Sequence, residues 1–272
     1  MPEPTLTFDT SRARMTIAFH EPPTPETLEA ISVRLTNDKV RTLHAMVDLD
    51  WRDPGAPDWD DPRYVAELER ALNPSLEAFI FETPTNTIAR QSYNTIGDIG
   101  DVLEACPKLQ RAFFTGCSTM RKTRHAHLRE LHLIGNPLDD SVISGLGTSQ
   151  FPALEKLALE QYDLPARELA AALRAIEAPR LSHACIDGVP VIDFLTIIGT
   201  AALPWTLCLR DPSFDDVDRL FSVIEQHNAL RSGKLWVDSG KFFGSEIAKL
   251  QEMDVTVASS HQLFNQGSYS DW

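Results

Sequence analysis

The densest group of residues that could do chemistry is an acidic segment, residues 48–61, with six aspartates and two tryptophans. Carboxylates spaced like Asp48 and Asp50 are oxygen ligands suited to a hard divalent cation. A metal-dependent hydrolase is therefore one hypothesis, although no EF-hand spacing is present; its further ligands would be Asp58, Asp60 and Asp61. The alternatives are a loop that grips a basic partner through Trp51 and Trp59, or a solvated loop whose tryptophans cover the adjacent repeat.

Three histidines form a weaker candidate metal site. His125, His127 and His132 could supply imidazole ligands, but they lie within or just after a basic stretch, residues 121–129. Neighbouring cations oppose the binding of another cation, so the sequence favours a solvated basic loop here.

The four cysteines indicate reduced thiols, because the chain is long and no pair has the C-x-x-C spacing of a zinc site. Cys185 and Cys208, with His183 nearby in sequence, could supply a thiol nucleophile, but nothing marks either thiol as activated. The phosphate-binding, nucleophile-elbow and zinc-protease motifs are absent from the sequence. We therefore expect a protein that is not an enzyme and that needs no metal and no cofactor.

The overall charge limits the class of partner. The chain has 39 acidic and 25 basic residues, a net charge of −14, so we expect it to repel nucleic acid and to tolerate a basic protein partner. No apolar run approaches 18 residues, which predicts no membrane span. The N-terminal residues lack a signal-peptide pattern, so we expect a cytoplasmic location.

The elements that must position any site follow from a repeated apolar spacing. Residues 128–138 match L-x-x-L-x-L-x-x-N-x-L at every position, and residues 154–164 match at all but the asparagine. Further copies in the same frame begin at Leu76, Leu109, Leu181, Pro204 and Ser232, with weaker copies at Val47/Leu49 and Val255/Val257. Most steps between copies fall within the roughly 20–29 residues of this repeat class.

This pattern resembles the leucine-rich repeat, and specifically bacterial leucine-rich-repeat proteins with ribonuclease-inhibitor-like units of one strand and one helix. The resemblance covers about residues 40–258 and implies an α/β solenoid, a curved parallel sheet with helices on its convex side. Apolar periodicity predicts these helices over residues 96–105, 139–146, 165–176, 192–201 and 215–224. The polar stretch 83–94 indicates an inserted loop, and the short unit 116–128 a return without a helix.

The chain divides into three regions. Residues 1–40 are expected to form an N-terminal cap, with a hairpin around residues 9–12 and a helix that starts at Thr24. Residues 41–258 form the solenoid, and residues 259–272 a polar C-terminal tail. Solenoids need such caps because an end repeat otherwise exposes its apolar face.

Strand alternation assigns two rows of side chains to the concave face. The residues between the last two apolar positions of each copy are Asp48, Ile80, Phe113, His132, Ala158, Cys185, Cys208, Trp236 and Thr256. The residues just after those positions are Asp50, Glu82, Thr115, Ile134, Glu160, Asp187, Arg210, Asp238 and Ala258. The second row has five acids and one base, and the first has apolar residues where polar ones would be the ordinary choice.

These rows favour a protein-binding face on which acids attract a basic partner and aromatic side chains anchor it. The alternative is that the acids only reflect an acidic composition and that the aromatics lie beneath the inserted loop. We expect a scaffold, monomeric when unbound, that serves as an immunity or inhibitor protein against a toxin or enzyme with a basic surface; an adaptor or regulatory role is the other binding hypothesis. The expected contact residues are Asp48, Asp50, Trp51, Trp59, Glu82, Phe113, His132, Glu160, Asp187, Arg210, Trp236 and Asp238.

Overall fold

A long, mostly parallel sheet forms the centre of the protein. The computed structural model describes residues 4–19, 24–47, 71–82, 95–135, 140–160, 164–210, 216–231 and 233–259. In this part of the chain eleven strands form one sheet, in which neighbours in the following order are hydrogen-bonded. The strands are β1 (Thr5–Asp9), β2 (Arg14–Phe19), β3 (Thr42–Val47), β4 (Ala78–Glu82), β6 (Arg111–Thr115), β8 (Glu130–Ile134), β9 (Lys156–Glu160), β10 (His183–Asp187), β11 (Thr206–Arg210), β12 (Leu235–Asp238) and β13 (Thr256–Ala258). The pair β1/β2 is antiparallel and the other pairs are parallel.

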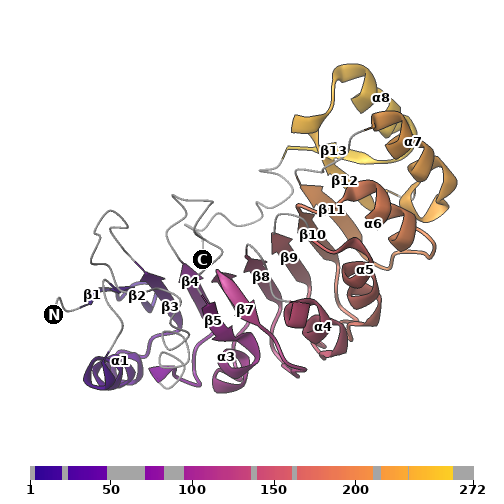
Figure 1. Ribbon diagram of the computed structural model, residues 1–272. Helices are drawn as coiled ribbons and strands as arrows, with labels where there is room; N and C mark the ends of the chain where they lie inside the picture. Colours follow the sequence, from indigo (N-terminus) through magenta and orange to yellow (C-terminus); the bar gives the residue numbers. More distant parts are fainter. Residues whose placement is uncertain are drawn as a thin grey trace, which may run out of the picture.

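Helices line one side of the curved sheet (Figure 1). They are α1 (Pro25–Asn37), α3 (Ile99–Ala105), α4 (Asp140–Thr148), α5 (Ala166–Ala175), α6 (Val191–Ile198), α7 (Val217–Gln226) and α8 (Gly244–Glu252), with the 3-10 turns η2 (Asn228–Arg231) and η3 (Ser239–Lys241). Each of the five helices predicted from periodicity is present within a few residues of its expected bounds. The predicted solenoid-like α/β fold with convex helices is therefore confirmed.

The parallel register brings the core positions of successive repeats into line. Equivalent residues that pair from strand to strand, each at most 1% exposed, are Phe79, Ala112, Leu131, Leu157, Ala184, Leu207 and Leu235. Because strand side chains alternate, this row faces the helices, and the residues on either side of it face the opposite surface. The sequence frame for these seven strands is confirmed.

The helices seal this core with their apolar faces. Helix α7, for example, buries Leu220, Phe221 and Ile224, and its N-cap Asp216 accepts hydrogen bonds from the first-turn backbone amides. Helix α8 is missing from the sequence-based prediction because it buries a single residue, Leu250, which leaves almost no periodic signal.

One unit has no helix, as its short polar sequence predicts. Residues 116–129 contain only the short strand β7 (Cys117–Thr119), which pairs in parallel with β5 (Thr95–Asp98) in a separate two-stranded sheet. Helix α4 packs directly on this segment: a Cβ atom at Gly145 would lie 2.1 Å from the carbonyl oxygen of Met120. Only glycine allows this close approach.

The predicted position of the first repeat is wrong by four residues. The register pairs Leu43 with Phe79 and Ala45 with Phe81, so these two fully buried residues take the core positions expected for Val47 and Leu49. The pattern x-apolar-x-apolar occurs twice in residues 42–49, and pairing with the buried β4 strand selects the first occurrence.

The N-terminal hairpin and helix form as expected. Strands β1 and β2 pair as a hairpin, and β2 continues the sheet by pairing in parallel with β3. Helix α1 begins after Thr24, whose Oγ1 accepts a hydrogen bond from the Thr27 amide at 3.2 Å, and Pro25 occupies the first turn. Of the helices described here, none is long and apolar enough to cross a membrane. Residues 83–94 and 260–272 lie outside the described residues.

Leu133→Ala and Leu159→Ala are each expected to lower the free energy of unfolding by about 2–5 kcal/mol. Both leucines are fully buried and pair across β8 and β9, so each truncation leaves a cavity that neighbouring repeats share. The measurement is urea denaturation followed by circular dichroism. Val33→Ala is the control because Val33 is 51% exposed, and its effect should stay within about 0.5 kcal/mol. Unchanged curves for both leucine variants would contradict the repeat frame.

Candidate functional site

The side chains on the face opposite the helices form three rows across the sheet, which we name by their place along the strands. The start row contains Arg14, Thr42, Ala78, Arg111, Glu130, Lys156, His183, Thr206 and, directly before β12, Lys234. The middle row contains Thr16, His44, Ile80, Phe113, His132, Ala158, Cys185, Cys208, Trp236 and Thr256. The end row contains Ala18, Met46, Glu82, Thr115, Ile134, Glu160, Asp187, Arg210, Asp238 and Ala258.

The predicted contact residues divide into two groups. Those that lie in the expected rows are Glu82, Phe113, His132, Glu160, Asp187, Arg210, Trp236 and Asp238. The acidic segment with Asp48, Asp50, Trp51 and Trp59 lies outside the described residues. The row positions assigned to Asp48 and Asp50 are a correction: His44 and Met46 occupy them, because β3 begins four residues earlier than the sequence frame places it.

A chain of polar contacts crosses four consecutive strands of this face. His132 Nε2 lies 2.8 Å from Glu160 Oε1, and Glu160 Oε2 lies 3.2 Å from Arg210 Nη1. Arg210 reaches over the intervening strand β10, where its Nε lies 3.7 Å from Asp187 Oδ2. The guanidinium therefore holds two carboxylates of the end row in place.

Glu160 is held by opposing electrostatic effects. Burial raises the pKa of its carboxyl, but the hydrogen bonds and charges of His132 and Arg210 outweigh burial, so that the pKa lies below its usual value. The side chain is 16% exposed. Glu160 is thus a charged, fixed group on a partly desolvated surface.

A second histidine–carboxylate pair lies at the other end of the sheet. His44 Nε2 is 2.7 Å from Glu82 Oε2, and the Arg14 guanidinium is 2.9 Å from His44 Nδ1. Because arginine can only donate, Nδ1 accepts and Nε2 carries the proton that is donated to Glu82. Both pairs place a middle-row histidine against an end-row glutamate of the next strand, so the repeat geometry produces the same contact twice.

Two expected contact residues are not accessible, which corrects the expectation that they stand on the surface. Phe113 is 2% exposed because it lies between Ile80 and His132 and contacts the His132 ring edge-on, with centroids 4.8 Å apart. Asp238 is 6% exposed because its carboxylate turns back to accept the Gly240 amide proton at 3.0 Å. Trp236 remains partly exposed and is the accessible aromatic of the middle row.

The cysteine hypothesis finds no support in the surroundings of the thiols. Cys185 and Cys208 pair in register, and both are buried. The hydrogen bond with Cys208 raises the pKa of the Cys185 thiol, and burial raises it further. A nucleophilic thiol needs the opposite shift, so Cys185 stays protonated at neutral pH.

His125, one of the three candidate metal ligands, has a structural role. His125 is 3% exposed; its Nε2 donates to the Cys106 carbonyl at 3.0 Å, and its Nδ1 accepts from the Leu128 amide at 3.0 Å. Burial lowers the pKa of this imidazole, which stays neutral and joins two turns. Across the described ranges, no three His, Cys, Asp or Glu side chains are grouped as metal ligands.

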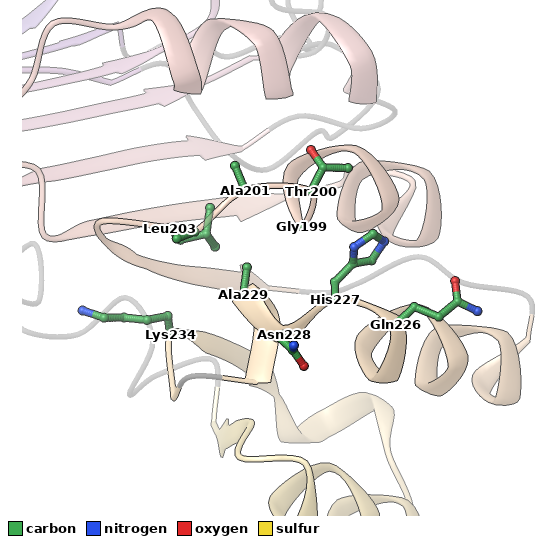
Figure 2. Close-up of a pocket in the computed structure, with 10 residues that line it drawn as sticks. Gly199, Thr200, Ala201, Leu203, Gln226, His227, Asn228, Ala229 and Lys234 are labelled. Atoms are coloured by element: carbon green, nitrogen blue, oxygen red, sulfur yellow. The ribbon is translucent and has the colours of Figure 1, made fainter.

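Open grooves lie between the turns of successive repeats, and one of them borders the start row at Lys234. One of about 630 Å³ lies between the turn after α6 and the turn after α7 (Figure 2). Its polar side chains do not converge: Lys234 extends away from His227 and Gln226 in Figure 2. A small-molecule site needs polar groups aimed at one point, so these grooves are less suited to chemistry than the strand face.

Comparison with known proteins supports the fold. No protein-family model matches the chain, and no curated protein matches it. A crystal structure of a Bacteroides fragilis protein from a structural genomics programme is similar, with a TM-score of 0.61 over 89% of this chain and 74% of that chain. The two sequences are 15% identical, so the similarity concerns the fold alone. The fold class is thus an α/β protein with a long, mostly parallel, solenoid-like sheet.

Sequence reasoning overlooked the start row. Its members stand one residue before the first core position of each strand, and alternation alone places them on the same face as the other two rows. Four of its nine members are Lys or Arg and one is acidic. The overall composition of the chain is acidic, so it gives no sign of this local excess of basic residues.

Glu160→Gln is expected to lower the free energy of unfolding by about 1–3 kcal/mol at pH 7, because it removes a charged hydrogen-bond acceptor. The folded-state pKa of Glu160 is lowered, so its stabilisation is fully present above about 4.5 and is lost as the pH falls toward the folded-state value. Denaturation at pH 7 and at successively lower pH should show the wild type and the variant converging. The exposed Glu225 supplies the control, Glu225→Gln. A difference that stays constant down to pH 3 would contradict the ionic role.

In a Cys106→Ala/Cys117→Ala background, the remaining thiols Cys185 and Cys208 are expected to react with Ellman's reagent at pH 8 at least about tenfold more slowly than in guanidinium. Burial and the raised pKa of Cys185 keep the thiolate fraction small. The measurement is absorbance against time. Labelling of the native protein as fast as that of the unfolded chain would restore the nucleophile hypothesis.

Proposed function

We propose that the protein is a non-enzymatic scaffold that binds another protein across the face formed by the three rows. The observation that carries this proposal is the contact chain from His132 through Glu160 to Arg210 and Asp187. These contacts hold polar and charged groups of four strands in place before any partner arrives. Pre-organised groups lose little entropy on binding, which is how a broad, open surface gains affinity.

The proposed partner is a protein with a basic surface, and the proposed role is that of an immunity or inhibitor protein. The net charge of −14 attracts such a partner from a distance, and the end row offers Glu82, Glu160 and Asp187 at short range. A toxin or enzyme that acts on an anionic substrate has a basic surface of this kind, and covering it would block its action. Trp236 would add an apolar anchor.

We also propose that the solenoid is built from leucine-rich repeats. The in-register leucine positions and the alternation of strands with helices support a leucine-rich repeat with ribonuclease-inhibitor-like units. This assignment agrees with a protein-binding role, because such solenoids use their extended concave surfaces for binding.

The partner can be identified by comparative affinity capture. Wild-type protein is immobilised beside two variants of equal charge, Glu82→Gln/Asp187→Asn on the strand face and Glu168→Gln/Asp193→Asn on the exposed surfaces of α5 and α6. A specific partner binds to the wild type and the helix variant and is depleted on the face variant. It should then lose its toxicity or catalytic activity on addition of one equivalent of the wild-type protein.

Binding kinetics with this partner should separate attraction from anchoring. Glu82→Gln/Asp187→Asn is expected to slow association and to weaken its salt dependence, since electrostatic attraction acts mainly on encounter. Trp236→Ala is expected to speed dissociation by about 30-fold, equivalent to about 2 kcal/mol. The control Phe243→Ala removes an aromatic side chain that is 79% exposed elsewhere and should change neither rate. Wild-type kinetics in both face variants would place the interface elsewhere.

A further inference from the structure

The start row and the end row carry opposite charge, although the protein as a whole is acidic. The start row contains Arg14, Arg111, Lys156 and Lys234, with Glu130 as its acid, whereas the end row presents Glu82, Glu160 and Asp187, with Arg210 as its base, because its fourth acid, Asp238, is buried. The two rows stand four residues apart on each strand, about 13 Å. The face is therefore basic where the strands begin and acidic where they end.

The positive charge is concentrated around His183 on β10. Lys156 pairs with His183 in register from β9, and Lys234 lies on the other side of it in the row, directly before β12. Burial lowers the pKa of His183, and both lysines lower it further. Lys156 also lies 3.4 Å from Glu130, which offsets one of the two lysine charges and leaves the charge of Lys234 as the local excess.

Polar and aromatic side chains surround this cationic cluster and hold His183 in place. Thr206 stands between His183 and Lys234 in the row, and the His183 ring meets the Trp236 ring edge-on, with centroids 6.3 Å apart. Ser182 Oγ lies 2.9 Å from His183 Nδ1, which fixes the imidazole. Lys156 and His183 stand on neighbouring strands about 4.8 Å apart, and Lys234 stands two strands further on, so the donors span about 14 Å of the row and can meet more than one carboxylate of an extended peptide.

We propose that Lys156, His183 and Lys234 form a carboxylate-binding site for an acidic segment of the partner protein, with Trp236 packed against the apolar part of that segment. This inference rests on the proposed function and refines it. The partner would carry acidic groups over the start row and basic groups about 13 Å away over the end row. It would consequently dock in one orientation, because the reversed pose would set like charges against each other in both rows.

The site can be tested without the partner, using hexaglutamate as the probe. The imidazole signals of histidine-labelled protein are followed by NMR, and His183 is assigned from the signal that the variant His183→Asn lacks. Hexaglutamate at low salt is expected to raise the pKa of His183, because bound carboxylates offset the two lysines. The signals of His44 and His132, which already contact glutamates, should move much less.

Variants and competing probes decide the outcome. In Lys156→Gln/Lys234→Gln the pKa of free His183 should rise, and hexaglutamate should bind about tenfold or more weakly. The control Lys108→Gln/Lys122→Gln removes two exposed lysines outside the rows and should leave binding unchanged. Charged groups that also face this region are Glu130, Glu160, Asp187 and Arg210, and none of them is altered.

Three results would overturn the inference: no response of His183 to hexaglutamate, an equal response in the double-lysine variant, or an equal response to inorganic phosphate at the same concentration. The last result would indicate a phosphate site in place of a carboxylate site. None of these results bears on the partner kinetics of Glu82→Gln/Asp187→Asn and Trp236→Ala. Failure of this inference and failure of the proposed function are thus separate outcomes.

Discussion

The stacking of core residues in an in-register parallel sheet is the constraint on which the rest of the structure depends. Leu131 and Leu157 must pair so that each helix can seal the same apolar layer, and this pairing fixes every other residue of their strands. Because alternation turns the intervening residues to the opposite face, the polar rows inherit the register of the core. A site on this face is therefore positioned by leucines that never touch a ligand.

The sequence predicts the architecture wherever apolar spacing is unambiguous, as in β8 and β9. It fails at β3, because Leu43-x-Ala45 and Val47-x-Leu49 have the same pattern and only pairing with β4 distinguishes them. It also places Phe113 correctly in its row without showing that His132 covers it, since burial depends on side chains from neighbouring strands. The apolar pattern of a strand is encoded locally, whereas its register and its side-chain contacts depend on the neighbouring strands.

The two levels of electrostatics on this protein have different ranges. The excess of acidic residues creates a field that acts over a Debye length, about 8–10 Å, at ordinary salt concentrations. The rows add charges at fixed positions: Arg210 partly offsets the charge of Glu160, whereas His44 donates a hydrogen bond to Glu82 without cancelling its charge. Net charge and the row acids therefore both speed the approach of a basic partner, and the rows also govern how that partner is oriented after it arrives.

The equal spacing of the strands limits how long a regular ligand can stay matched to it. An α-helix laid across the sheet presents one turn every ~5.4 Å, whereas the strands follow one another every ~4.8 Å. The two periods diverge by about 0.6 Å per strand. After about four strands, a side chain of the helix therefore lies midway between two strands instead of over one. A helical ligand laid across the sheet could therefore make equivalent contacts with only a few neighbouring strands.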